Sequence, residues 1–196
     1  MTPNRLVPTM LVLASAVLLA AVACGSSTTP TGAVDTANPT AGAEAATGEG
    51  VPVPYIDSQF HYRIDAPGRM AAKPDGTAAY VGPSERLEIG IIQGTTAVDS
   101  SALATQDIKS LASSAPAFHQ LSNPAKLTLG GYQVTRFAYT WNAGMSVVTG
   151  KAIELTSVRY YLLKDSKTLA VITYGIVTNQ FDPQGADDIV STFRWQ

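Results

Sequence analysis

Alternation of apolar and polar residues predicts β-strands over much of the chain after residue 54. FHYRID and RLEIGIIQ each place an apolar side chain at every second position, which is typical of a strand with one buried face. The inward positions are Phe60, Tyr62 and Ile64 in the first segment and Leu87, Ile89 and Ile91 in the second. Both segments are therefore expected to line a core.

Three longer segments predict the central strands of a sheet, at 132–141, 152–163 and 168–177. The last two are apolar at consecutive positions, so we expect both faces of the sheet to be covered, at least in part. Shorter strands are expected at 79–81, 118–121 and 126–129.

Apolar residues recur with a helical period in two segments, one in the middle of the chain and one at its C-terminal end. Asp99 or Ser100 is the expected N-cap of a helix that runs to about Ser114. Its apolar stripe consists of Leu103, Ala104, Ile108, Leu111 and Ala112. The pattern predicts a helix packed on the sheet.

The C-terminal segment FDPQGADDIVSTFRWQ predicts a closing helix. Asp182 is its expected N-cap and Pro183 its first residue. The apolar face consists of Ala186, Ile189, Val190 and Phe193. The fold class expected for 55–196 is therefore α+β, with a mainly antiparallel sheet of six to eight strands packed against a middle helix and a C-terminal helix.

The N-terminal segment reads as a signal peptide, 1–23. Its apolar run, 10–23, is shorter than the ~20 residues that a membrane-spanning helix needs. Ala21-Val22-Ala23 is a cleavage pattern, and cleavage after Ala23 leaves Cys24, the only cysteine, as the first mature residue. Residues 25–54 contain no aromatic residue, Lys or Arg, so 24–54 is expected to be a lipidated cysteine followed by a flexible tether.

This stretch resembles a bacterial lipobox, whose cysteine is acylated before the leader is removed. The resemblance implies that Cys24 carries more than one acyl chain, such as palmitate, and anchors the protein to membrane lipid on the extracytoplasmic side. A secreted protein with a free thiol and an uncleaved membrane anchor are the alternatives.

The folded part resembles the PsbP-like fold, including its bacterial branch of LpqN/LpqT-type lipoproteins. The likeness is carried by the opening FHYRIDAPG, the closing DDIVSTFRW and the order of strands and helices between them. It implies a binding or assembly role, often in support of a membrane complex. It supplies no metal-binding residue and no cofactor.

Composition and motifs do not point to an enzyme. Charged residues make up 14% of the chain and the net charge is -2, which does not favour nucleic-acid binding. A single cysteine cannot form an intramolecular disulfide or a thiolate zinc cluster. No H-E-x-x-H, G-x-S-x-G or P-loop pattern occurs, and His61 and His119 are expected to face solvent. We expect no catalytic residue.

Two groups of residues are candidates for recognition. The connection 142–151 places Met145, Val147 and Val148 where a partner or a membrane can contact them, unless the loop folds back onto the sheet. Several aromatic residues are the second group, with a candidate pocket at Trp141, Arg159 and Tyr174, although sheet packing explains most of them. Arg136 is the other possible polar anchor.

The expected function is that of a membrane-anchored extracytoplasmic lipoprotein that binds or assembles a protein partner without catalysis. The alternative is a small-ligand carrier or a hydrolase tethered to the outer face of the membrane.

Overall fold

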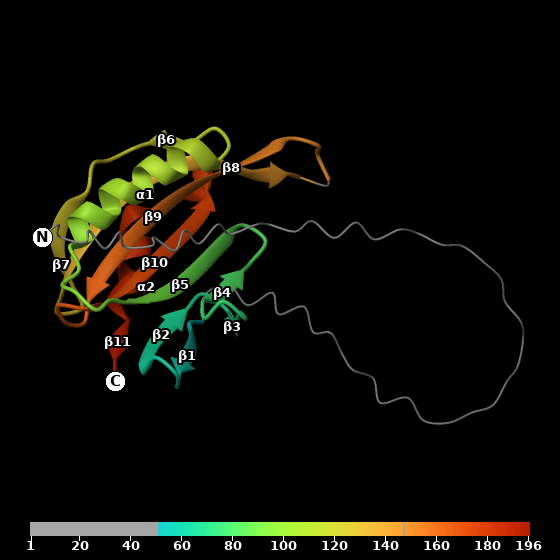
Figure 1. Cartoon of the computed structure of the whole chain (residues 1–196). Coiled ribbons are helices and arrows are strands. Elements are labelled where there is room, and N and C mark those ends of the chain that lie inside the picture. Colours follow the sequence, from blue (N-terminus) through green and yellow to red (C-terminus); the bar gives the residue numbers. More distant parts are fainter. Residues whose placement is uncertain (1–50, 147) are drawn as a thin grey trace, which may run out of the picture. The chain divides into compact units, whose positions relative to one another are not determined.

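The computed structural model describes residues 51–146 and 148–196 (Figure 1). The predicted signal peptide, Ala23, Cys24, the tether up to residue 50 and Val147 lie outside the described residues. The predictions made for them remain predictions.

Most of the strands belong to one antiparallel sheet of eight strands within the described residues. In spatial order it contains β3 (Ala71–Ala72), β4 (Ala78–Val81), β5 (Glu85–Gln93), β10 (Thr168–Val177), β9 (Ala152–Leu163), β8 (Tyr132–Met145) and β6 (His119–Gln120), and β7 (Ala125–Leu129) also pairs with β8. A smaller sheet has the order β1 (Val53–Asp57), β2 (Tyr62–Ala66) and β11 (Arg194–Trp195). The helices are α1 (Ser100–Ser114) and α2 (Pro183–Ser191), and η1 (Thr178–Gln180) is a 3-10 turn.

This arrangement confirms the predicted α+β class, with a mainly antiparallel sheet, a middle helix and a C-terminal helix. The strands predicted at 152–163 and 168–177 have the predicted bounds. The strand predicted at 132–141 continues to Met145, because its pairing with β9 extends beyond Trp141.

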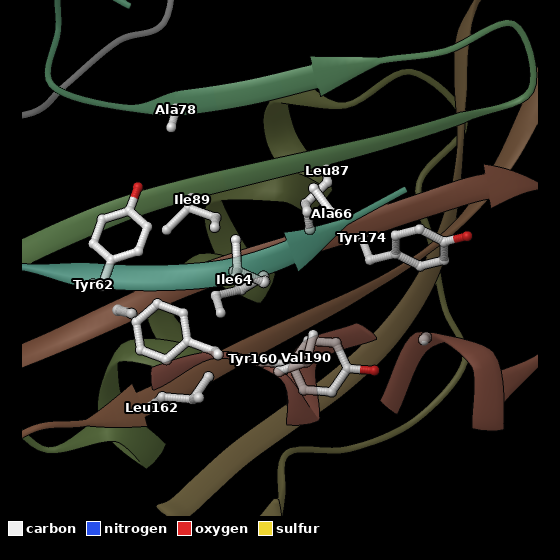
Figure 2. Packing of buried hydrophobic residues seen from close by; sticks show 14 of the residues in the cluster. Tyr62, Ile64, Ala66, Ala78, Leu87, Ile89, Tyr160, Leu162, Tyr174 and Val190 are labelled. Carbon is white, nitrogen blue, oxygen red and sulfur yellow. The ribbon is translucent and has the colours of Figure 1, made fainter. Parts of the chain in front are cut away.

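Both faces of the central strands are covered, as the continuous apolar runs predicted. On one face, Ala104 of α1 packs with Phe137, Tyr139, Tyr161 and Leu169. The opposite face packs against the smaller sheet and α2, and Figure 2 shows part of this cluster, which includes Tyr62, Ile64, Ile89, Tyr160, Leu162 and Val190. The large sheet therefore lies between two hydrophobic cores, one on each face.

Helix α1 begins at its predicted N-cap. The Asp99 carboxylate accepts hydrogen bonds from the backbone N–H groups of Ser101 and Ala102, at 2.9 and 3.2 Å, and so satisfies two donors of the first turn. Its apolar stripe packs on the sheet except for Ala112, which is exposed. The helix therefore covers the sheet with a narrower stripe than the sequence indicated.

Helix α2 is shorter than the predicted closing helix. Asp182 caps it, accepting from Gln184 and Gly185 N–H at 3.0 and 3.1 Å, but the helix ends at Ser191. The chain then forms β11, whose Arg194 and Trp195 pair with Arg63 and Tyr62 of β2. Phe193 is buried as predicted, although it follows the helix.

The first strand also differs from the prediction. The inward alternation is Tyr62, Ile64 and Ala66 in β2, whereas Phe60 and the exposed His61 lie in the turn that follows β1. His61 has a positive φ of 55°, and the Asp57 carboxylate accepts the backbone N–H of Phe60 at 2.9 Å. Strand β1, which begins at Val53, was not predicted.

Candidate functional site

The connection predicted to carry recognition is the tip of a β-hairpin. Strands β8 and β9 pair regularly from Val134 to Asn142, shift register, and pair again between Met145 and Ala152. The turn is closed by the backbone bond from Ser146 N–H to the Lys151 carbonyl at 2.8 Å. In Figure 1 this hairpin extends well beyond the helices that cover the sheet.

Apolar side chains at the hairpin tip are exposed. Met145 is 64% and Val148 is 89% exposed, which is high for residues of this kind. Neither side chain folds back onto the sheet. Of the three residues proposed for this loop, two are thus available to a binding partner, and Val147 lies outside the described residues.

A hollow of about 530 Å³ lies beside the hairpin, along the residues from its turn at Ser146 and Thr149 to Glu154. Three segments converge on it: the β4–β5 turn at Pro83, the hairpin itself, and the end of β10 with η1. Its apolar wall includes Ile153 and Val177, and its polar wall includes Lys151 and Glu154. A smaller hollow of about 170 Å³ lies elsewhere, beside Ser100 and Thr135.

The candidate pocket at Trp141, Arg159 and Tyr174 is not assembled, so this prediction is wrong. Trp141 and Arg159 share the face of the sheet that α1 covers. Thr173 is the cross-strand neighbour of Arg159, so the next residue, Tyr174, points to the opposite face. There its hydroxyl donates to Glu85 at 2.8 Å and its ring packs in the other core.

Arg159 holds helix α1 on the sheet. Its Nη1 donates to the Asp107 carboxylate at 2.9 Å, and its Nε donates to Thr173 Oγ1 at 3.0 Å. The Tyr161 hydroxyl donates to the same Asp107 oxygen at 2.6 Å. Burial alone would lower the pKa of Arg159, but Tyr139, Tyr161 and Asp107 outweigh it and raise that pKa. The guanidinium is occupied within the fold.

Arg136, the other arginine considered as an anchor, has an equivalent role on the opposite face. Its Nη1 hydrogen-bonds both carboxylate oxygens of Asp187 in α2. The Tyr160 hydroxyl donates to Asp187 at 2.9 Å. Asp187 therefore fixes α2 to the sheet.

Arg86 is the arginine that the sequence analysis passed over. Its Cζ lies 5.1 Å from the centre of the Trp141 ring, in a cation–π contact. The Trp141 Nε1–H donates to Ser157 Oγ at 3.1 Å, which fixes the indole. Alternation in RLEIGIIQ placed Arg86 opposite Leu87, but nothing in the sequence showed that it would lie over Trp141.

The described residues contain no group of three or more His, Cys, Asp or Glu side chains that could hold a metal ion. His119 lies in β6 and His61 in the first turn, and both are exposed. Burial raises the pKa of Tyr160 and of Tyr161, so both phenols stay protonated at neutral pH. In the same part of the chain, no helix is long and apolar enough to span a bilayer.

Comparison with protein-family models finds no match. Comparison with curated proteins also finds none.

Solved structures do match. The Ran-binding protein Mog1p of Saccharomyces cerevisiae aligns with a TM-score of 0.51 and 11% identity, over 74% of this chain and 95% of that one. A Bacteroides thetaiotaomicron protein aligns with a TM-score of 0.51 and 10% identity over 74% of this chain, which spans about half (49%) of that protein's length. LpqN of Mycobacterium tuberculosis, described as involved in cell envelope biogenesis, aligns with a TM-score of 0.38 and 14% identity, over 75% of this chain and 83% of its own.

The two matches at 0.51 concern the fold alone. They define the class of protein as an α+β domain whose fold is like that of Mog1p. They assign no activity to it.

Proposed function

We propose that this chain is a membrane-anchored extracytoplasmic lipoprotein, and that its folded domain is a PsbP-like, non-catalytic module that binds or assembles a protein partner. The observation that carries the proposal is the exposed apolar tip of the β8–β9 hairpin, with Met145 and Val148. Exposed apolar side chains on a rigid two-stranded element favour a partner that buries them.

The contacts of the Asp107 and Asp187 carboxylates support binding rather than catalysis. The partly buried carboxylates of Asp187 and Asp107 each pair with an arginine and a tyrosine that join a helix to the sheet. Groups engaged in this way are not available as a general base. This supports recognition through exposed side chains as the proposed function.

Anchoring rests on the sequence around Cys24. A cleavage pattern ends at the only cysteine of the chain, and the following residues are rich in Gly, Ala, Ser, Thr and Pro. Mass spectrometry of the mature protein tests this directly. We expect an N-terminal Cys24 that carries acyl chains, and Cys24→Ala should release the protein from membranes. A mature protein with an unmodified thiol would contradict the anchor.

Partner binding is tested by capture from detergent-solubilised membranes of the source cells. Wild-type protein should recover a reproducible partner, and Met145→Ser combined with Val148→Ser should reduce the recovery. Ile56→Ser is the matched control, because Ile56 is 62% exposed but lies on β1, in the smaller sheet. No reproducible partner, or equal loss with the control, would contradict the proposal.

A small-ligand carrier is the second candidate, and the hollow of about 530 Å³ beside the hairpin is the observation in its favour. It is the weaker candidate because the side chains of both cores fill the space on the two faces of the sheet. A hydrolase has less support, because both histidines, the usual general bases, are exposed outside the hollow.

A further inference from the structure

Arg86 lies across the α1-facing side of the sheet, beyond the part that α1 contacts. The register aligns Arg86 of β5 with Gly175 of β10, Ser157 of β9 and Tyr139 of β8 in one cross-strand row. To reach the Trp141 ring on β8, the arginine side chain must pass over Gly175 and approach Ser157. Strands β10 and β9 thus lie between β5, which carries Arg86, and β8, which carries Trp141.

Gly175 makes this path possible. A Cβ atom at position 175 would lie 2.7 Å from Ser157 Oγ and 3.4 Å from Arg86 Cγ. The absence of a side chain at position 175 leaves room over β10 for the side chain of Arg86. The guanidinium lies over the ring of Trp141.

The other charged groups of this face that neighbour Arg86 have partners of opposite sign. Arg159 pairs with Asp107 at 2.9 Å, and Lys73 pairs with Glu88 at 3.1 Å. Among the described residues, Arg86 has neither an ion pair nor a side-chain hydrogen bond. One positive charge on this face is therefore uncompensated.

Arg86 is partly exposed. Trp195 Nε1 is the one fully buried side-chain nitrogen or oxygen without a partner in the described part of the chain. The Arg86 nitrogens are therefore not fully enclosed. Burial lowers the pKa of Arg86, and Glu88 offsets this only in part, so an anion that joined the guanidinium would relieve an existing electrostatic cost.

We propose that Arg86, held by its contact with Trp141, forms a binding site for a single carboxylate group. A planar carboxylate matches the fork of N–H donors on a guanidinium, and Trp141 holds that fork in place. The site does not depend on the hairpin and extends the proposed function.

Carboxylate fits better than a phosphate group. One uncompensated positive charge balances one negative charge, and the nearby Glu88 carboxylate disfavours a dianion. The body of the ligand has a surface to lie on at Val177, which follows Gly175 along β10 on the same face and is partly exposed. Val177 also lines the hollow beside the hairpin.

Tryptophan fluorescence of the full chain tests the site. The chain has two tryptophans, so Trp195→Phe leaves Trp141 as the reporter. The probes are sodium benzoate, acetyl-alanyl-leucine with a free carboxylate, the same peptide as its amide, inorganic phosphate and sodium chloride. We expect benzoate or the peptide acid to change the Trp141 emission with a Kd on the order of 1 mM, as suits one charged contact.

The two carboxylate probes distinguish the source of the group. Binding of benzoate alone indicates a free carboxylic acid, and binding of the peptide acid alone indicates a polypeptide terminus or acidic side chain. Binding of both supports the site for carboxylates in general. If neither probe changes the emission, or if the peptide amide, phosphate or chloride has the same effect, the proposal is overturned.

Variants at position 86 separate the site from a general effect of charge. Arg86→Gln should weaken binding by about tenfold or more, and Arg86→Lys by about threefold or more, because lysine keeps the charge but lacks the fork. Arg69→Gln is the control, since Arg69 is exposed and lies in the turn after β2. A thermal melt confirms that each variant folds. Equal binding by folded Arg86→Gln, or equal loss with Arg69→Gln, would overturn the proposal.

Discussion

At the scale of single residues, the Arg159–Asp107 pair differs from the surface pair Lys73–Glu88 in burial. The side chains of Arg159 and Asp107 are 23% and 32% exposed, whereas those of Lys73 and Glu88 are 43% and 50% exposed. Removing one partner of a sheltered pair leaves a charge that water screens poorly, whereas an exposed pair contributes little.

Asp107→Asn should therefore lower the free energy of unfolding by about 1–3 kcal/mol, because Arg159 loses its charged partner and a neutral amide oxygen is a weaker acceptor for Arg159 and the Tyr161 hydroxyl. Glu88→Gln should lower it by at most about 1 kcal/mol. Urea unfolding of both variants at neutral pH measures the difference. Equal effects would contradict the assigned role of Asp107.

Gly175 provides a second prediction at this scale. Gly175→Ala should destabilise the fold by about 1–3 kcal/mol, since the added Cβ would lie 2.7 Å from Ser157 Oγ and Ser157 would have to move. Gly90→Ala is the matched control on the same face, where the added Cβ would meet only Thr77 Cγ2 at 3.6 Å. Thermal unfolding compares the two, and similar melting shifts would contradict the packing at Gly175.

At the scale of elements, the N-cap of α1 makes a defined contribution to the free energy of unfolding. Asp99→Ala should cost about 1 kcal/mol, because two backbone donors of the first turn lose their acceptor, and Asp99→Ser should restore most of it. The protection of α1 amides from hydrogen exchange should decrease in the same order, from wild type to Asp99→Ser to Asp99→Ala. No loss with alanine would contradict the capping role.

The elements that the sequence predicted well are those with a strong local pattern. The bounds of β9 and β10 follow from long apolar runs, and the helix starts follow from Asp99 and Asp182. Strands β1 and β11 have no such signal, since they form because they pair with β2. Pairing is decided by the whole fold and not by the two or five residues involved.

The candidate site was predicted less well for the same reason. Exposure of Met145 and Val148 followed from a connection between two strong strands. The grouping of Tyr174 with Trp141 and Arg159 was wrong because the relative register of β9 and β10 decides which face each residue occupies. The contact of Arg86 with Trp141 joins strands that are not sequence neighbours, so no local pattern carries it.

At the scale of the whole molecule, both cores are rich in buried tyrosines. Tyr62, Tyr160 and Tyr161 are at most 1% exposed, and burial, with nearby carboxylates second for Tyr62 and Tyr160, raises the pKa of each well above its usual value near 10. A hydrogen bond to Asp107 acts in the same direction on Tyr161. In the folded protein these phenols therefore keep their protons under conditions where the unfolded chain loses them.

The sign of the resulting pH dependence follows from proton linkage. Above about pH 10 the unfolded state binds fewer protons than the folded state, so the free energy of unfolding falls as the pH rises. The stabilising contribution is complete below the unfolded pKa and is lost as the pH approaches the raised folded values. Each such tyrosine lowers stability by up to about 1.4 kcal/mol per pH unit in that window.

Tyr160→Phe tests this behaviour at one position. Phenylalanine does not titrate, so the variant should lose stability near neutral pH, where its hydrogen bond to Asp187 is missing, but its stability should fall less steeply above about pH 10. Urea unfolding at intervals between about pH 8 and 11 gives both slopes. Parallel pH curves for the variant and the wild type would mean that Tyr160 ionises alike in both states, which its complete burial beside a carboxylate does not allow.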